Sequence, residues 1–151
     1  SIGITNVNPL IKKAKNRKIE FESLYDVFQA YRKKIIFSKI KDKELNVYIN
    51  SIFKITNNKA YLNYNSEWEA RMYELAGLQD MEIWKNLHKL EVPTLIITPD
   101  NKPVFKLSRN KYIKANKYIK TISIKNSTHL FPLENPNETL MHIISFYKEI
   151  S

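Results

Sequence analysis

The chain contains no cysteine and only two glycines, Gly3 and Gly77. Without cysteine it forms no disulfide bond, offers no thiolate nucleophile and holds no cysteine-ligated zinc. A Gly-x-Ser-x-Gly nucleophile elbow, a Gly-x-Gly-x-x-Gly dinucleotide loop and a Walker A loop all need closely spaced glycines. Because Gly3 and Gly77 lie far apart in the sequence, any serine nucleophile or phosphate loop of these kinds must come from another polypeptide.

Long apolar runs are missing as well. The longest run of apolar residues is far shorter than the roughly 20 residues that a membrane-spanning helix needs. The amino-terminal residues show no secretory signal pattern. Together with the lack of cysteine, these features predict a cytoplasmic protein without a membrane partner.

The residues that are present predict a folded protein. With 151 residues, of which 43% are hydrophobic, the chain can build one domain with its own core. The net charge of +10 raises the hypothesis of a nucleic-acid binder. The lysines are scattered through every predicted element and form no dense block, so we regard nucleic-acid binding as the weakest of the functional hypotheses. The positive charge also leaves open the hypothesis of an anionic substrate.

The second half of the chain has the pattern of a strand, a helical segment, a second strand and a final helix. Residues 92–98 form a short apolar run that predicts a fully buried strand, and residues 118–124 predict the second strand. The last helix is expected to start with Asn135 as N-cap, Pro136 at its first position and Glu138 in its first turn. Such an order predicts two parallel strands, with ligands bound beyond their carboxyl ends.

His129 follows the second strand directly, in the loop before the last helix. It therefore falls at a carboxyl end of the predicted parallel sheet, where chemistry is concentrated in folds of this type. The other two histidines, His88 and His142, are interpreted as surface or packing residues because each lies within a predicted helix.

The first half of the chain predicts mostly helices. Residues 2–7 predict a short strand, and residues 10–17 a basic, irregular segment. Four helices are predicted, at residues 23–36 with Ser23 as cap, at 42–53, at 66–77 ended by Gly77, and from Asp80 to Leu87. A hairpin is predicted between the second and third of them, at residues 52–64, with its turn at Asn57 and Asn58.

The run Val92-Pro93-Thr94-Leu95-Ile96-Ile97, followed by Thr128-His129-Leu130-Phe131-Pro132-Leu133-Glu134-Asn135-Pro136, resembles the C-terminal end of an α/β-hydrolase. The resemblance covers roughly the second half of the chain. It implies an α/β fold with a partial parallel sheet of about three strands and flanking helices. It also implies that residues 1–7 are a strand of the core, residues 8–79 a helical lid or cap, and residues 80–151 the C-terminal α/β core segment. The alternative for residues 8–79 is an ordinary helical subdomain.

In this family the histidine after the last strand is the general base, so the resemblance assigns that role to His129. The acid that orients it often lies in the turn after the preceding strand. Asp100 is the sole acid of that turn, but it stands two or three residues before the usual place. Asp100 is therefore either the triad acid or a turn-forming residue beside Pro99. In some members the acid instead follows the family's sixth strand, which residues 2–7 resemble; the corresponding residue here is Asn6, which cannot carry the negative charge.

Two further groups of residues have open roles. Glu134 is predicted to act at the N-terminus of the last helix, where the helix dipole favours a carboxylate. The aromatic residues of the helical part belong either to the core or to a substrate pocket, and core is the stronger hypothesis; they are Phe28, Tyr31, Tyr48, Trp68 and Tyr73. No spacing of His, Asp and Glu suggests a metal site, and no cofactor is predicted.

Three functions follow. The first is the C-terminal part of an α/β-hydrolase acting on an ester or similar small apolar substrate, inactive alone because it lacks the serine nucleophile. Its partner is either an N-terminal half-chain or a second copy, bound through an exposed sheet edge. The second function is a non-catalytic remnant that serves interaction or oligomerisation. The third is the basic nucleic-acid binder.

Overall fold

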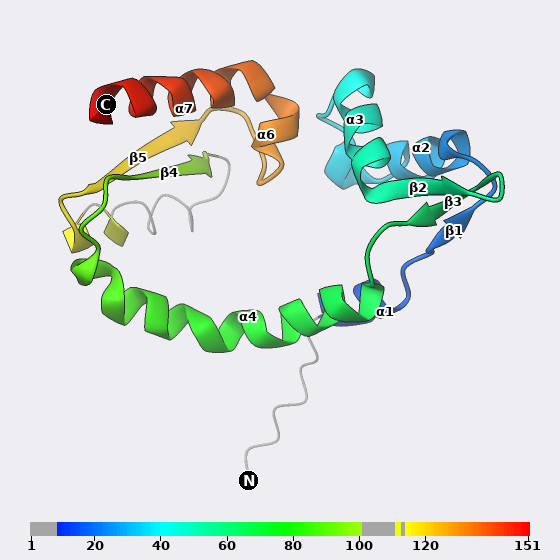
Figure 1. The fold of residues 1–151 in the computed structure, drawn as a ribbon, viewed down its shortest axis with the longest axis horizontal. Coiled ribbons are helices and arrows are strands. Elements are labelled where there is room, and N and C mark those ends of the chain that lie inside the picture. Colours follow the sequence, from blue (N-terminus) through cyan, green and yellow to red (C-terminus); the bar gives the residue numbers. More distant parts are fainter. Residues whose placement is uncertain (1–8, 101–110, 113) are drawn as a thin grey trace, which may run out of the picture. The chain divides into compact units, whose positions relative to one another are not determined.

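A computed structural model describes residues 9–100, 111–112 and 114–151 of the chain (Figure 1). The chain divides into two compact units. Unit 1 comprises Ser1–Ser38 and Leu45–Glu82, and unit 2 comprises Lys39–Glu44 and Ile83–Ser151. The strand predicted at residues 2–7 lies outside the described residues, so it remains a prediction. The domain boundaries predicted at residues 7–8 and 79–80 also remain predictions; residues 79–80 lie within the helix α4.

Unit 1 contains a small antiparallel sheet surrounded by helices. Its elements, some of which run on into unit 2, are α1 (Pro9–Lys15), β1 (Glu20–Phe21), α2 (Leu24–Arg32), the 3-10 helix η1 (Ile35–Phe37), α3 (Asp42–Ile52), β2 (Phe53–Thr56), β3 (Lys59–Leu62) and α4 (Ser66–Asn86). The three strands are ordered β1-β3-β2, and both pairings are antiparallel.

The predicted hairpin is confirmed, and the conformation of its turn explains why asparagine stands at both turn positions. Asn57 and Asn58 have φ angles of 50° and 61°. Two consecutive positive φ angles are those of a type I′ turn, which matches the twist of a two-stranded hairpin and which asparagine tolerates better than most residues. The third strand, β1, was not predicted, because a two-residue strand is recognisable only through its partner β3.

Two helices of unit 1 differ from the prediction, one at its C-terminal end and one along its whole length. The Ser23 side chain accepts a hydrogen bond from the backbone N–H of Asp26, as the predicted cap requires, but α2 ends at Arg32 rather than at residue 36. The segment expected to be irregular, residues 10–17, mostly forms α1. Pro9 fits the first position of α1 because the N–H that proline lacks would have no partner there.

α4 is one continuous helix, so the predicted interruption at Gly77 and Asp80 is wrong. No described glycine adopts a positive φ angle, which is the conformation that a helix-ending glycine needs. A glycine inside a helix costs only about 1 kcal/mol relative to alanine, and a helix of 21 residues tolerates that cost.

The core of unit 1 is aromatic. Tyr31, which is 2% exposed, stacks on Phe37 with ring centroids 5.2 Å apart. Phe53 meets Tyr31 and Phe21 edge-on at 5.9 and 5.6 Å, and Tyr48 packs on Phe37 at 5.5 Å. The core interpretation therefore holds for Tyr31 and Tyr48.

Other aromatic residues of the helical part lie outside this core. The Trp68 side chain is 64% exposed. Phe28 is half-buried beneath the guanidinium of Arg32, whose central carbon lies 5.5 Å from the ring centroid.

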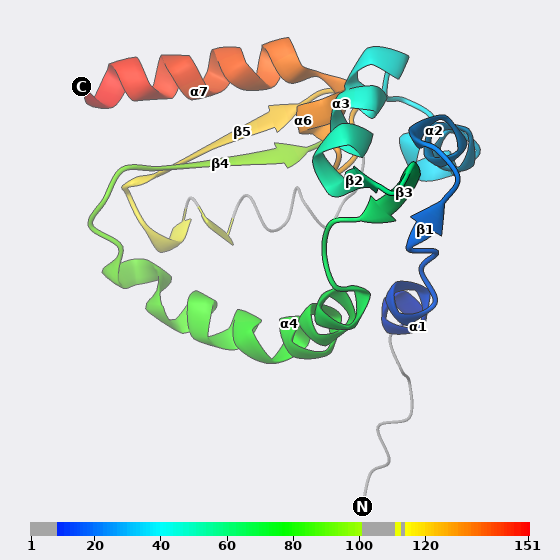
Figure 2. The same ribbon diagram turned by 45° about the vertical axis from the view of Figure 1, so that its right-hand side comes forward.

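Unit 2 contains the predicted parallel strands. β4 (Thr94–Pro99) and β5 (Ile119–Ile124) pair in parallel, in register from Thr94 opposite Ile119 to Pro99 opposite Ile124. They are accompanied by the 3-10 helix η2 (Leu87–Lys89) and by α6 (Phe131–Glu134) and α7 (Pro136–Ile150). α7 runs alongside the sheet after β5 (Figures 1 and 2). Asn135 precedes α7 as expected, although its side chain makes no capping hydrogen bond.

β4 is less enclosed than a fully buried strand. Its residues from Thr94 to Ile97 are half-buried, and only Thr98 and Pro99 are buried. β5 is the single strand that pairs with β4 among the described residues, and strands of parallel sheets are normally covered on both faces by helices. No helix in the described part of the chain has the length and apolar character to cross a membrane.

Candidate functional site

His129 lies in the loop that leaves β5, and its side chain is exposed. β5 ends at Ile124, and Asn126 turns the chain with a positive φ of 52°. The loop therefore stands at the carboxyl end of both strands, because β4 and β5 are parallel. This is the edge at which parallel α/β sheets place their chemistry.

The start of the loop is fixed by two hydrogen bonds within unit 2. Ser127 is completely buried, and its Oγ donates to the carbonyl oxygen of Ile124 at 2.8 Å. The Nζ of Lys39 donates to the carbonyl oxygen of Asn126 at 2.7 Å. Both bonds hold the backbone just before His129.

Glu134 holds the residue directly before His129. Its carboxylate, in a residue only 8% exposed, accepts hydrogen bonds from the backbone N–H of Thr128 at 2.7 Å and from Thr128 Oγ1 at 2.5 Å. Thr128 Oγ1 in turn accepts a hydrogen bond from the backbone N–H of Leu130 at 3.1 Å. The two neighbours of His129 are thus tied, through Thr128, to one carboxylate.

Glu134 lies just before the N-terminus of the last helix, as predicted, but its hydrogen bonds go to Thr128 in the loop. Glu134 ends the short helix α6, two residues before the first residue of α7, and its side chain turns back to the loop. A buried carboxylate must be hydrogen-bonded, and the N–H and hydroxyl of Thr128 supply those bonds. The spacing of six residues between Thr128 and Glu134 is not a capping pattern, so the sequence offered no signal for this pair.

Asp100, the candidate triad acid, lies at the same edge of the sheet. It follows β4, its side chain is exposed, and its backbone N–H donates to the carbonyl oxygen of Ile124 at 3.2 Å. Asp100 and His129 are thus placed at the ends of neighbouring strands. Within the described residues, no hydrogen bond joins their side chains, so the triad role of Asp100 remains a prediction.

The other two histidines lie away from this loop. His88 is exposed in η2, which precedes the amino-terminal end of β4. His142 is half-buried on α7, with its Nε2 3.9 Å from Glu138 Oε1 one turn earlier. Among the described residues, no group of three or more His, Asp or Glu side chains is arranged to hold a metal ion.

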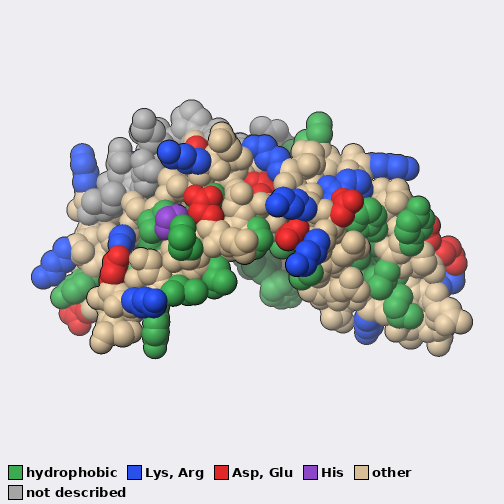
Figure 3. All heavy atoms as spheres, turned by 90° about the horizontal axis from the view of Figure 1, so that it is seen from above, with side chains coloured by type: hydrophobic (Ala, Val, Ile, Leu, Met, Phe, Trp, Pro, Cys, Tyr) green, Lys and Arg blue, Asp and Glu red, His purple; other side chains and the backbone are tan. Residues whose placement is uncertain are grey.

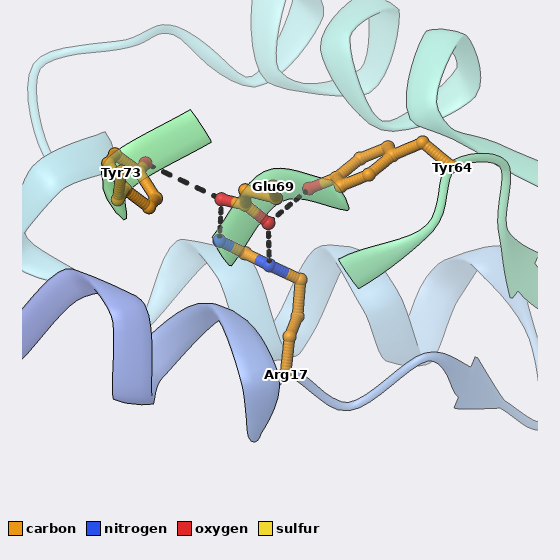
Figure 4. Close-up of polar contacts among 4 residues, drawn as sticks. All are labelled: Arg17, Tyr64, Glu69 and Tyr73. Carbon is orange, nitrogen blue, oxygen red and sulfur yellow. Dashed lines mark hydrogen bonds and ion pairs between the residues drawn. The ribbon is translucent and has the colours of Figure 1, made fainter. Parts of the chain in front are cut away.

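Unit 1 contains a second polar cluster, which the sequence did not reveal (Figure 4). Arg17 donates from Nε and Nη2 to the two carboxylate oxygens of Glu69 at 2.9 and 2.7 Å. The hydroxyls of Tyr64 and Tyr73 donate to the same carboxylate at 3.2 and 3.5 Å. The partners lie 52 residues apart in the sequence, which is why no local pattern predicts them.

The charges in this second cluster satisfy one another. Burial acts to lower the pKa of Arg17, but the hydrogen bond to Glu69 and the attraction of nearby acidic groups outweigh it and raise that pKa. Burial raises the pKa of Tyr64, against the opposing effect of Arg17. With both carboxylate oxygens of Glu69 occupied, the cluster links the end of α1 to α4. The His129 loop remains the better candidate for chemistry.

Comparison with known proteins reveals the fold. No protein-family model matches the chain, and no curated protein matches it in sequence. Its structure is similar to that of the peroxisomal α/β-hydrolase Lpx1 of Saccharomyces cerevisiae, with a TM-score of 0.74 and 14% identity, over 99% of this chain and 42% of that one. It is also similar to E-2-(acetamidomethylene)succinate hydrolase, with a TM-score of 0.71 and 16% identity, over 94% of this chain and 52% of that one.

A third similar structure is the thioesterase domain from the curacin biosynthetic pathway. The TM-score is 0.61 and the identity 11%, over 94% of this chain and 51% of that one. The chain therefore spans only about half the length of the structures it matches. At these identities the likeness concerns the fold.

Proposed function

We propose that this chain, which has part of an α/β-hydrolase fold, supplies the general base of an ester-hydrolysing enzyme through His129. One observation carries the proposal. His129 is exposed at the carboxyl end of β5, on a loop whose backbone is held by Glu134, Ser127 and Lys39. A base must be accessible to substrate and must be held in one place, and this loop meets both requirements.

The chemistry would follow the triad scheme. The imidazole of His129 takes the proton from a serine hydroxyl as the serine oxygen attacks the ester carbonyl, and the resulting imidazolium gives that proton to the leaving alcohol. Water then repeats the sequence and releases the acid. Asp100 is the candidate for the carboxylate that accepts a hydrogen bond from the other imidazole nitrogen, since it directly follows the neighbouring strand β4.

The nucleophile and the oxyanion hole would come from a segment other than these 151 residues. The two glycines of the chain cannot form a Gly-x-Ser-x-Gly elbow. The similar structures are about twice as long as the part that the chain matches, so they have room for such a segment. The chain alone is then expected to be inactive, and residues 8–79 would serve as the lid over a small apolar substrate.

The test is reconstitution with an α/β-hydrolase segment that carries the serine elbow, using an aryl ester as substrate. His129→Ala should lower kcat at least about a thousandfold, because loss of the base removes the proton transfer. His88→Ala is the matched control, an exposed histidine of the same unit, and should leave kcat unchanged. Equal rates for wild type and His129→Ala would refute the role of His129.

A variant of Asp100 separates its two interpretations. If Asp100 is the triad acid, Asp100→Asn should reduce kcat by orders of magnitude in the reconstituted enzyme, since the histidine would lose its orienting charge. If it only forms the turn, asparagine should serve equally well, because both residues favour turns. The ratio of the two kcat values decides between them.

The alternative function is a non-catalytic interaction protein with the same fold. It is favoured by the lack of a hydrogen bond between the side chains of Asp100 and His129 among the described residues. A reconstituted complex that binds tightly but hydrolyses no ester would support this alternative.

A further inference from the structure

A pocket in unit 2 lies at the amino-terminal end of the parallel strands, away from His129. It has a volume of about 570 Å³, which is the size of a site for a small organic molecule rather than for a bare ion. One wall is formed by η2 and the loop before β4, and the other by the residues that lead into β5. Its polar and aromatic lining consists of His88, Lys89, Glu91, Asn116, Lys117 and Tyr118.

The side chain of Asn116, a residue only 8% exposed, holds the two walls together. Its Nδ2 donates to the carbonyl oxygens of Leu87 and Leu90 at 2.9 and 2.7 Å, and its Oδ1 accepts a hydrogen bond from the backbone N–H of Tyr118 at 2.9 Å. The backbone N–H of Thr94 donates to the carbonyl oxygen of Tyr118 at 2.9 Å. The pocket is therefore built into the start of the sheet, and the backbone on both sides is in place to receive a ligand.

The charge of the pocket is positive. Lys89 and Lys117 line it from opposite walls, and both residues are exposed. Neither is paired with an acidic side chain in the described part of the chain. The Nζ of Lys117 lies 5.1 Å from the centroid of the Tyr118 ring, and this attraction keeps the ammonium group beside the pocket. Glu91 is the one acid in this lining, so the lysines outnumber it.

We propose that this pocket binds a soluble phosphate monoester that carries a small apolar group. Two ammonium groups on opposite walls can donate hydrogen bonds to one phosphate, toward which lysine acts as a point charge. A planar carboxylate is better recognised by the fork of an arginine, and this lining contains no arginine. The apolar group of the ligand lies against Leu90 and against the ring of Tyr118, which is 40% exposed.

The distribution of charge favours a small anion over a nucleic acid. Among the described residues on the face shown in Figure 3, Lys and Arg side chains are scattered among Asp and Glu side chains and form no continuous basic tract. Nucleic acids need such a tract because they bind through many phosphate contacts. A pocket with one lysine on each wall offers contacts for a single phosphate group.

The pocket is separate from the edge of the sheet at which His129 lies. β4 and β5 each have six residues, so their two ends are on the order of 20 Å apart. A small ligand held between Lys89 and Lys117 therefore does not reach His129. The inference goes beyond the proposed ester hydrolysis and does not rest on it.

The experiment measures the Kd of phenyl phosphate for the 151-residue chain by isothermal titration calorimetry. Lys89→Gln and Lys117→Gln should each raise the Kd about tenfold or more, because each removes a hydrogen bond between charged groups. Lys125→Gln is the matched control, since it removes the same charge from an exposed lysine just beyond the other end of β5, and should change the Kd less than about twofold. Glu91→Gln should lower the Kd about twofold to fivefold, because it removes a repelling charge.

Two further measurements locate the ligand and test its class. In NMR spectra of the isotope-labelled chain, the backbone amides of residues 116–118 should shift when phenyl phosphate is added, and those of residues 128–130 should not. Inorganic phosphate and phenol should each bind more weakly than phenyl phosphate, because each makes only part of the contacts. The four variants replace exposed side chains, so their melting temperatures should match that of the wild type.

The proposal is overturned if phenyl phosphate binds with a Kd above about 10 mM, or if both lysine variants bind it as the wild type does. It is also overturned if the shifted amides are those of residues 128–130, or if inorganic phosphate binds as tightly as phenyl phosphate. Binding of an RNA oligonucleotide, or of vesicles containing phosphatidic acid, that needs Lys89 and Lys117 while phenyl phosphate does not bind would assign the pocket to a nucleic acid or a lipid headgroup instead.

Discussion

The two units differ in what they bury. Among the described residues, unit 1 holds eleven buried hydrophobic residues, namely Ala14, Phe21, Val27, Tyr31, Phe37, Leu45, Ile49, Phe53, Ala60, Leu62 and Ala70. Unit 2 holds three, namely Ile40, Ile119 and Ile124. In the described part of the chain the buried polar residues all belong to unit 2, namely Thr98, Asn116, Ser127, Glu134 and Thr139.

The described residues of the two units are therefore stabilised in different ways. Unit 1 has an aromatic core of its own and can draw its stability from apolar burial. The described part of unit 2 has hydrogen bonds at the ends of its strands, and Thr94–Ile97 of β4 are only half-buried. A hydrogen bond contributes only about 1 kcal/mol net, so substitutions in these polar contacts should cost less than substitutions in the core of unit 1. Variants of the two units can test the contrast.

The largest loss is expected from the core of unit 1. Phe53→Ala removes a side chain that is 4% exposed and should lower the free energy of unfolding by about 3–5 kcal/mol, through lost burial and the cavity left behind. Ile55→Ala changes an apolar residue of the same strand that is 54% exposed, and should cost less than about 1 kcal/mol. Urea unfolding followed by circular dichroism measures both. Equal losses would contradict the placement of the core.

The next effect concerns the link between α1 and α4. Glu69→Ala leaves the half-buried guanidinium of Arg17 without its carboxylate and should cost about 2–3 kcal/mol. Glu74→Ala is the matched control on the same helix. Its ion pair with Lys15 is longer, at 3.5 Å, and more exposed, so the loss should stay below about 1 kcal/mol. The same urea titration measures both, and a reversed order would refute the link.

Alkaline pH should weaken unit 1 specifically. Burial raises the pKa of Tyr31, Tyr48 and Tyr64 above the ordinary value near 10. The folded state then holds these protons more tightly than the unfolded state, so their contribution is complete below about pH 10 and is lost as pH rises further. The slope is at most about 1.4 kcal/mol per pH unit for each tyrosine. Lys34, whose pKa is lowered by burial, acts in the opposite sense.

The measurement is the free energy of unfolding between pH 8 and 12, with tyrosinate absorbance recorded in parallel. Tyr31→Phe should flatten the decline, because phenylalanine keeps the ring and cannot ionise. A decline that begins well below pH 10 would rule out the tyrosines as its cause.

A smaller effect is expected in the His129 loop. Glu134→Ala removes the acceptor of the Thr128 N–H and hydroxyl and should cost about 1–2 kcal/mol. Hydrogen exchange of the Thr128 amide should become faster. Glu138→Ala, which removes a more exposed carboxylate four residues later, should leave that exchange rate unchanged. Unchanged exchange in Glu134→Ala would show that the loop is held by other contacts.

The smallest effect is expected for the ion pair between β5 and α7. Lys120 and Glu149 are 45 and 48% exposed, so Lys120→Met should change the free energy of unfolding by less than about 1 kcal/mol. The change should shrink further in high salt, because exposed charges are screened. Urea unfolding at two salt concentrations tests this. A loss above 2 kcal/mol would mean that the pair is a main anchor of α7.

Local signals account for the parts of the fold that the sequence predicted. The parallel strands, the Asn57-Asn58 hairpin and the start of α2 at Ser23 each follow from a few neighbouring residues. Prediction failed where a preference was weak or the partner was remote. Gly77 only disfavours a helix slightly, so α4 continues through it, and β1 depends on a partner that lies some 40 residues later.

By itself the sequence determined that His129 follows a strand of a parallel pair and that the two glycines of the chain cannot form a nucleophile elbow. Those facts depend on residue order alone. Only the tertiary structure decided that Glu134 holds the loop, that Glu69 pairs with Arg17, and that Trp68 lies outside the aromatic core. The physical reason is that hydrogen bonds and burial depend on distances between side chains, and the folded chain brings together residues that the sequence separates.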